Sequence, residues 1–193
     1  MSGYTMTQPE LYYALPAAIT KNTYTSQAPI SAIASSSVPR CVVPALYFNQ
    51  VGKAAHVKAW GTIANASAAT FIFAAGLDAA AGTIGGTGGA TLFTTAALTP
   101  TASVTAPWFL DMDITCQAVG NLGTTLQVNA DLTVNNVASS GAWGTGSQET
   151  MCANTLTGLN NEIALWLELF GTWSASSASN TTTLQQFKVY LEN

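Results

Sequence analysis

Two runs of strictly alternating side chains constrain the fold of this chain more than any other feature. In residues 108–117 and 125–134 the apolar side chains occupy every second position, and the positions between them are polar apart from Phe109. A period of two places successive side chains on opposite faces of an extended backbone. Both runs therefore predict β-strands with one face in a core. The inward residues are Trp108, Leu110, Met112, Ile114 and Cys116 in the first run and Leu126, Val128, Ala130, Leu132 and Val134 in the second.

Short β-like runs separated by clusters of Gly, Asn, Ser and Thr extend this pattern along the chain. The additional predicted strands are residues 42–48, 54–64, 69–75, 90–96, 162–173 and 182–191. Many short strands separated by turn residues are typical of sandwiches and barrels. We therefore predict an all-β fold, a jelly-roll-like antiparallel β-sandwich of about eight strands, with residues 41–193 as one domain.

The run 162–173 allows two interpretations. A short helix capped by Asn161 would place Ile163, Trp166, Leu167 and Phe170 on one face. The alternation of Ile163, Leu165, Leu167 and Leu169 favours a strand instead. In that strand Trp166 and Phe170 point away from the core and need cover from a loop, from the N-terminal segment or from another subunit.

Residues 1–40 differ from the rest of the chain. They contain Pro9, Pro16, Pro29 and Pro39 and the serine run 35–37, and they lack a long periodic pattern. We interpret them as an extended N-terminal arm. Such an arm can lie along its own domain, be disordered, or reach a neighbouring subunit.

The charge composition excludes several classes of partner. Only 7% of the 193 residues are charged, five basic and nine acidic, compared with about 25% in an average soluble domain. The net charge of −4 is the wrong sign for coating nucleic acid, and no apolar run is long enough for a membrane span. We expect neither nucleic acid nor membrane as a partner. The N-terminus shows no secretory signal, and the three cysteines fit free thiols in a protein made in a reducing cytoplasm.

The candidate chemistry is sparse. His56 is the only histidine, and no GxSxG motif accompanies it. Asp111 and Asp113 share one face of a strand, with Asp131 on another strand; such a group can bind Ca²⁺, act as paired carboxylates, or form a solvated face. The glycine-rich run 81–90 lacks the lysine of a phosphate loop and predicts a flexible connection. We expect no enzyme activity, catalytic residue, cofactor or metal, and leave open whether Asp111 and Asp113 bind a cation.

Residues 49–63, NQVGKAAHVKAWGTI, resemble a segment that recurs in small virion proteins of tailed bacteriophages. The similarity continues through ASAATF at residues 66–71 and returns in TTLQQFKVY at residues 182–190. Those proteins look like jelly rolls encoded among head and tail genes. The resemblance implies a structural virion protein without a catalytic motif. We expect Gly52 to make the tight turn before the next strand, where a side chain would crowd the backbone.

What the resemblance implies most directly is a capsid decoration or cement protein on the exterior of the phage head. Its partners would be the major capsid protein and further copies of itself, as a homotrimer, because threefold lattice positions favour trimers. Candidate interface residues are Trp166, Phe170, Lys53, Tyr12 and Tyr13. Some relatives are minor tail proteins. The alternative is therefore a tail or head-fibre module that recognises host glycan through loops around Trp143 and the glycine-rich run.

Overall fold

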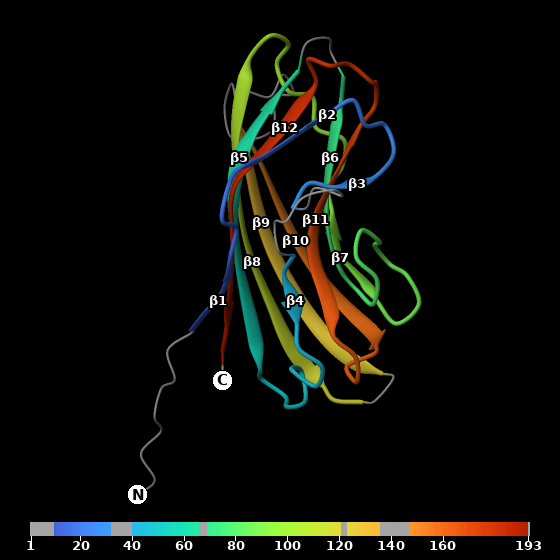
Figure 1. Cartoon of the computed structure of the whole chain (residues 1–193). Helices are drawn as coiled ribbons and strands as arrows, with labels where there is room; N and C mark the ends of the chain where they lie inside the picture. The colour runs from blue at the N-terminus through green and yellow to red at the C-terminus, as the bar shows by residue number, and fades with distance from the viewer. Residues whose placement is uncertain (1–9, 32–39, 66–68, 121–122, 136–146, 193) are drawn as a thin grey trace, which may run out of the picture.

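The computed structural model describes residues 10–31, 40–65, 69–120, 123–135 and 147–192. In these residues twelve strands form two antiparallel sheets that pack face to face (Figure 1), which confirms the predicted all-β sandwich. The strands are β1 (Glu10–Ala14), β2 (Ile19–Asn22), β3 (Ala28–Pro29), β4 (Val42–Val43), β5 (Ala54–Ala64), β6 (Phe71–Asp78), β7 (Ala90–Thr94), β8 (Thr105–Ala118), β9 (Thr124–Asn135), β10 (Ser147–Leu159), β11 (Leu165–Trp173) and β12 (Thr181–Leu191). The described residues contain no helix that could cross a membrane.

Eight of the twelve strands, in the orders β2-β12-β5-β8 and β3-β11-β6-β7, follow the strand order of a jelly roll. The large sheet runs β1-β12-β5-β8-β9-β10, with β2 also on β12, and the small sheet runs β3-β11-β6-β7, with β4 also on β11. The chain crosses between the sheets from β2 to β3, from β4 to β5, from β5 to β6, from β7 to β8, from β10 to β11 and from β11 to β12, as in the two Greek keys of a jelly roll. Strands β9 and β10 extend the large sheet beyond that framework.

The core follows the predicted alternation. The inward residues predicted in β8 and β9 are all buried. At one end of the sandwich, the ring of Phe73 lies 4.6 Å from that of Phe71 and 5.0 Å from that of Trp108, and Trp173 lies 4.7 Å from Phe71. The three cysteines are free thiols as predicted; Cys41 and Cys116 are buried and Cys152 is partly exposed.

The predicted strand at residues 42–48 is wrong over most of its length. Only Val42 and Val43 pair, with β11, and residues 45–48 form a turn in which Leu46 has a φ of 63°. The Tyr47 hydroxyl donates to the carbonyl of Ala54 at 2.5 Å and lies 2.9 Å from that of Glu192. These contacts fix the segment as a corner between the sheets, so it cannot extend β4.

Strand β10 is absent from the predicted set because its sequence has no apolar alternation. From Met151 onward its partly buried positions include Asn154, and its exposed positions include Met151 and Ala153. It lies at the edge of the large sheet and pairs only with β9 in the described chain. An edge strand buries little apolar surface, which leaves its sequence without a strong period.

The described part of the N-terminal segment lies along the protein's own sandwich. Strands β1 and β2 pair with β12, and β3 pairs with β11. Leu15, Ile19 and Ile30 are buried, and the latter two are each 1% exposed. Residues 10–31 therefore contribute to both sheets and to the core, which is the first of the three placements that the sequence allowed.

Two glycines meet different constraints. Gly52 has a φ of +90°, and no atom lies within 4 Å of the place a Cβ would occupy. Its role in the turn before β5 is therefore conformational, whereas the expected crowding is absent. At Gly61 in β5, a Cβ would lie 1.9 Å from the carbonyl oxygen of Thr183 on β12, so only glycine permits this close approach of the two strands.

Candidate functional site

The outer side of the large sheet, facing away from the small sheet, carries polar, charged and aromatic side chains in transverse rows. The strand registers place residues of β12, β5, β8 and β9 side by side in each row. The three rows, hereafter the charged face, are Tyr190–His56–Asp113–Asn129, Lys188–Lys58–Asp111–Asp131 and Gln186–Trp60–Phe109–Thr133.

Charge is divided unevenly across this face. Lys188, Lys58 and His56 lie on β12 and β5, whereas all three aspartates lie on β8 and β9. In the middle row, the two lysines are direct cross-strand neighbours, and so are Asp111 and Asp131. Like charges placed directly opposite destabilise a sheet, so this order is unfavourable within a single molecule.

Only part of this charge is compensated within the chain. Lys58 Nζ lies 3.2 Å from Asp111 Oδ2. Lys188 Nζ lies 5.5 Å from the centre of the Trp60 ring, within the range of a cation–π contact. Among the described residues Lys188 has no acidic partner and Asp131 no basic one, and Oδ1 of Asp131 is buried without a hydrogen bond.

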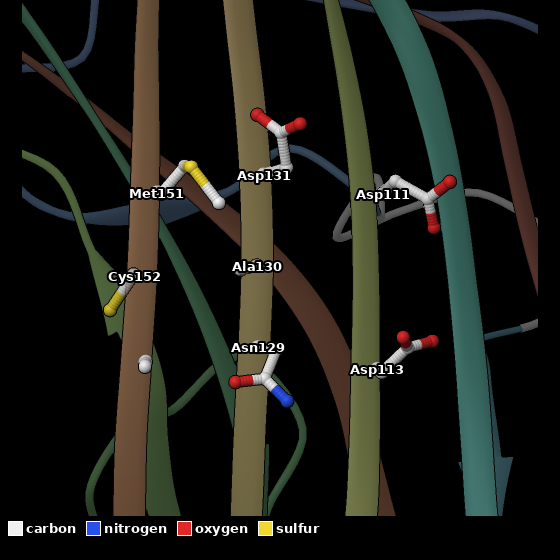
Figure 2. Close-up of a pocket in the computed structure, with 8 residues that line it drawn as sticks. Asp111, Asp113, Asn129, Ala130, Asp131, Met151 and Cys152 are labelled. Carbon is white, nitrogen blue, oxygen red and sulfur yellow. The ribbon is translucent and has the colours of Figure 1, made fainter.

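A shallow groove of about 400 Å³ crosses the acidic half of the charged face toward β10. Figure 2 shows Asp111 and Asp113 on β8, Asn129 and Asp131 on β9, and Met151 on β10. Met151 is 80% exposed. The described residues include no group of three or more His, Cys, Asp or Glu side chains that could hold a metal ion. The carboxylates of Asp111 and Asp113 instead pair with Lys58 and His56.

His56 joins two parts of the sheet through both ring nitrogens. Nδ1 contacts Asp113 on β8, and Nε2 lies 2.9 Å from Glu192, the residue after β12. Burial lowers the pKa of His56, but the hydrogen bond to Glu192 and the charge and hydrogen bond of Asp113 outweigh this effect and raise the pKa above 6.5. The two contacts of His56 clamp β5 to β8 and to the end of β12.

On the outer side of the small sheet, two buried carboxylates hold the glycine-rich loop. Glu168 accepts a hydrogen bond from Arg40 at 2.7 Å through Oε1 and one from the Gly82 N–H at 2.5 Å through Oε2. Asp78 accepts a hydrogen bond from the Gly86 N–H at 2.6 Å. Both acids are 2% exposed. The sequence predicts a flexible connection here, but these bonds fix the loop over the sheet.

The same side of the small sheet carries two residues that the sequence predicts as interface candidates, Trp166 and Phe170. A Cβ at Gly76, the β6 neighbour of Glu168, would lie 2.7 Å from the side chain of Ile84, so the loop packs directly on the sheet. Trp166 is partly exposed, but Phe170 is 1% exposed. Phe170 is therefore wrong as an exposed contact residue: the molecule itself supplies the cover that its outward position requires.

The other predicted interface residues gather near the edge of the large sheet at β1. Tyr12 is 44% exposed and donates from its hydroxyl to the carbonyl of Val42 at 2.6 Å. Tyr13 is partly buried, with its ring 5.7 Å from that of Phe187. Lys53 Nζ lies 5.2 Å from the centre of the Tyr47 ring, and Tyr47 and Tyr12 line one groove of about 320 Å³.

Through Tyr47, this edge groove links Tyr12 to Lys53, whereas Trp166 lies on the other sheet. The groove is completed by Glu10, Leu11, Pro44 and Leu191. Trp143, the candidate for glycan recognition, lies outside the described residues.

The sequence did not indicate the Arg40–Glu168 pair or the joining of the two halves of the charged face. A weak signal was present for both. Glu168 lies two residues from Trp166 and two from Phe170, and so on the same face of an otherwise apolar run. His56, Lys58 and Trp60 likewise occupy alternate positions of β5. Parity identifies a common face, but it does not identify the neighbouring strand.

Comparison with known proteins gives little further guidance. No family model and no curated protein matches the chain. Among solved structures, it is similar to one described as "Structure of the CBM2 module of Lactobacillus casei BL23 phage J-1 evolved Dit", with 11% sequence identity and a TM-score of 0.39 over 98% of this chain and 99% of that one. This likeness is too remote to bear on the function of the chain.

Proposed function

We propose that this chain is a structural virion protein of a tailed phage, and that it decorates the outer surface of the head as a symmetric oligomer. The positions of two segments that resemble phage virion proteins support this proposal. Residues 54–63 are in β5 and residues 182–190 are in β12, and these strands pair at the centre of the large sheet. The two segments thus form one structural unit, although more than 100 residues separate them.

The observation that carries the proposed attachment is the open edge at β1. In the described chain, β1 pairs with β12 on one side and with no strand on the other. Leu11 and Tyr12 on this strand are 54% and 44% exposed, beside the edge groove. Unpaired backbone groups next to exposed apolar side chains favour addition of an extended segment from another protein. We assign this edge to a segment of the major capsid protein.

The role would be mechanical. Apolar surface buried between the chain and adjacent capsid subunits would strengthen the shell without any chemical step. Low charge suits this role, because copies packed at high local density repel one another weakly.

The first test is to separate purified virions into heads and tails and to measure the copy number of this chain in each fraction by mass spectrometry. Decoration predicts many copies on heads. A few copies on tails would contradict it and favour the tail-module alternative. Absence from both fractions would overturn the proposal of a virion protein.

A second test examines the β1 edge directly. Leu11→Asp should weaken binding of the full chain to heads that lack it by about tenfold or more, because a charge would be desolvated in the contact. Val104→Asp is the matched control. Val104 is 36% exposed and lies just before the start of β8, at the opposite end of the large sheet from Leu11. Unchanged binding of the Leu11 variant would rule out this edge as the attachment site.

A further inference from the structure

We infer that the charged face is a self-association surface on which two copies pack outer face to outer face about a twofold axis that runs parallel to the strands between β5 and β8. This inference deepens the proposed oligomer by naming its contact, and in that sense rests on the proposed function. It depends on how charge is ordered across the four strands.

The twofold axis reverses the order of the strands in the second copy. A twofold axis in this position places β5 of one copy over β8 of the other and β12 over β9, while keeping each residue at its own height along the strands. Every row of the charged face then meets the same row of the second copy in reversed order. The basic half of one molecule therefore covers the acidic half of the other.

Side chains of opposite charge face each other across this axis. In the middle row Lys58 faces Asp111 of the second copy, and Lys188 faces Asp131. In the neighbouring rows, His56 faces Asp113 and Trp60 faces Phe109. The rows thus bring opposite charges together beside a contact between Trp60 and Phe109, of which Phe109 is 41% exposed.

The pairing uses the groups that are left uncompensated in one molecule. Lys188 and Asp131 have no ion-pair partner in the described chain, and each lies beside a like charge on the adjacent strand. An alternating order of charges would suit an isolated sheet better. The observed order is two cations followed by two anions. When a second copy lies over it in reversed order, each cation faces an anion.

The distances permit this contact. Strands lie about 4.8 Å apart, so Lys188 and Asp131 would each be about 7 Å from the axis. Aligned sheets cross at about 30°, which displaces facing positions at that radius by about 4 Å. A lysine side chain can span that displacement. An axis elsewhere on the sheet would lose the match, because it would no longer exchange β5 with β8.

The test is a charge-reversal cycle on the full chain, measured by sedimentation equilibrium. We expect the natural protein to dimerise, and Lys188→Glu and Asp131→Lys each to raise the dissociation constant about tenfold or more, since each pair occurs twice in the dimer. The double variant should return within about threefold of the natural protein, because the two exchanged side chains would again carry opposite charges across the contact. Lys53→Glu and Glu162→Lys, with the same charge changes away from this face, should leave dimerisation unchanged.

Loss of folding can be separated from loss of contact. Lys188→Glu places an acid beside Lys58, and Asp131→Lys places a base beside Asp111. Thermal unfolding of the single variants should therefore be unchanged or shifted to higher temperature. Dimerisation that is lost without a loss of stability supports the inference.

Several results would overturn it. These are a natural protein that is monomeric or trimeric at all concentrations, a double variant that stays as weak as the singles, or control variants that weaken association equally. Binding of a glycan to the charged face of a monomeric protein would also overturn it. The experiment needs no virion, so its failure is distinguishable from failure of the head-decoration proposal.

Discussion

At the scale of single residues, the pair of the partly buried Arg40 and the buried Glu168 joins the glycine-rich loop to the small sheet. Glu168 is buried within an apolar strand and accepts bonds from Arg40 and from the backbone of the glycine-rich loop. A buried carboxylate without its cation is strongly unfavourable. This pair thus couples the conformation of the loop to the small sheet.

We therefore expect Arg40→Met to lower the free energy of unfolding by about 3 kcal/mol, because it leaves the Glu168 charge buried and unpaired. Urea unfolding followed by tryptophan fluorescence measures this. Lys53→Met is the matched control and should cost less than about 1 kcal/mol, since the Lys53 ammonium group lies over the Tyr47 ring and has no ion pair among the described residues. Equal losses of unfolding free energy in both variants would show that the contact of Arg40 with Glu168 stabilises the protein no more than the contact of Lys53 with Tyr47 does.

His56 provides a prediction on pH. Its pKa in the folded protein is raised above the ordinary value of 6.5. The resulting stabilisation is fully present below 6.5 and is lost as the pH rises through the raised pKa. Comparing the natural protein with His56→Gln, we expect an advantage on the order of 0.5 kcal/mol at about pH 5.5 that shrinks at about pH 9, a small effect because solvent screens these groups.

Denaturant unfolding of both proteins at the two pH values measures this difference. An advantage that grows with pH would contradict the sign of the pKa shift. It would also show that contacts with Asp113 and Glu192 do not hold the proton on His56.

At the scale of strands, the N-terminal segment stabilises the sandwich. Strands β1 and β2 cover one side of β12, and β3 lies beside β11. Without them β12 would be an open edge next to the centre of the large sheet. Residues 10–31 therefore cannot act as a detachable arm.

Deleting residues 1–31 should destabilise the protein by several kcal/mol. The deletion removes the buried side chains of Leu15, Ile19 and Ile30, each worth about 1.5–3 kcal/mol. Thermal unfolding by circular dichroism, with limited proteolysis, would measure the effect. A deleted protein with unchanged stability and protease resistance would show that these strands are dispensable.

At the scale of the whole molecule, the distribution of charge matters more than its total. The chain has a net charge of −4, which by itself disfavours association of identical copies. The charged face separates basic from acidic side chains, so contact between two copies in the proposed orientation is attractive although the molecules repel on average.

We expect the proposed dimer to weaken when NaCl is raised from about 0.05 M to about 0.5 M, because salt screens the attraction between Lys188 of one copy and Asp131 of the other. Sedimentation at several salt concentrations would detect this. An association that strengthens with salt would indicate a contact dominated by apolar surface, and would place it elsewhere, such as at Leu11 and Tyr12.

The sequence alone was sufficient to predict the fold class and most of the long strands. Strand β5 has the predicted bounds, and β8, β9 and β12 extend the predicted runs by three residues or fewer at each end. These strands have one face in the core and the other in solvent, so their hydrophobic period is a direct record of their environment. Strands β1, β2, β3 and β10 carried no such record, because short or peripheral strands bury too little surface to impose a period.

The candidate site depended on contacts that only the tertiary structure makes. Parity placed Asp111 with Asp113 and His56 with Lys58, but nothing local to either run shows that β5 lies beside β8. Likewise, nothing near Phe170 shows that a loop from residues 79–89 closes over its sheet. Alternation can be recognised from consecutive residues of one segment. The order of the strands, and the loops that cover a sheet, depend on which distant segments exclude water together, and a period of two carries no information about those partners.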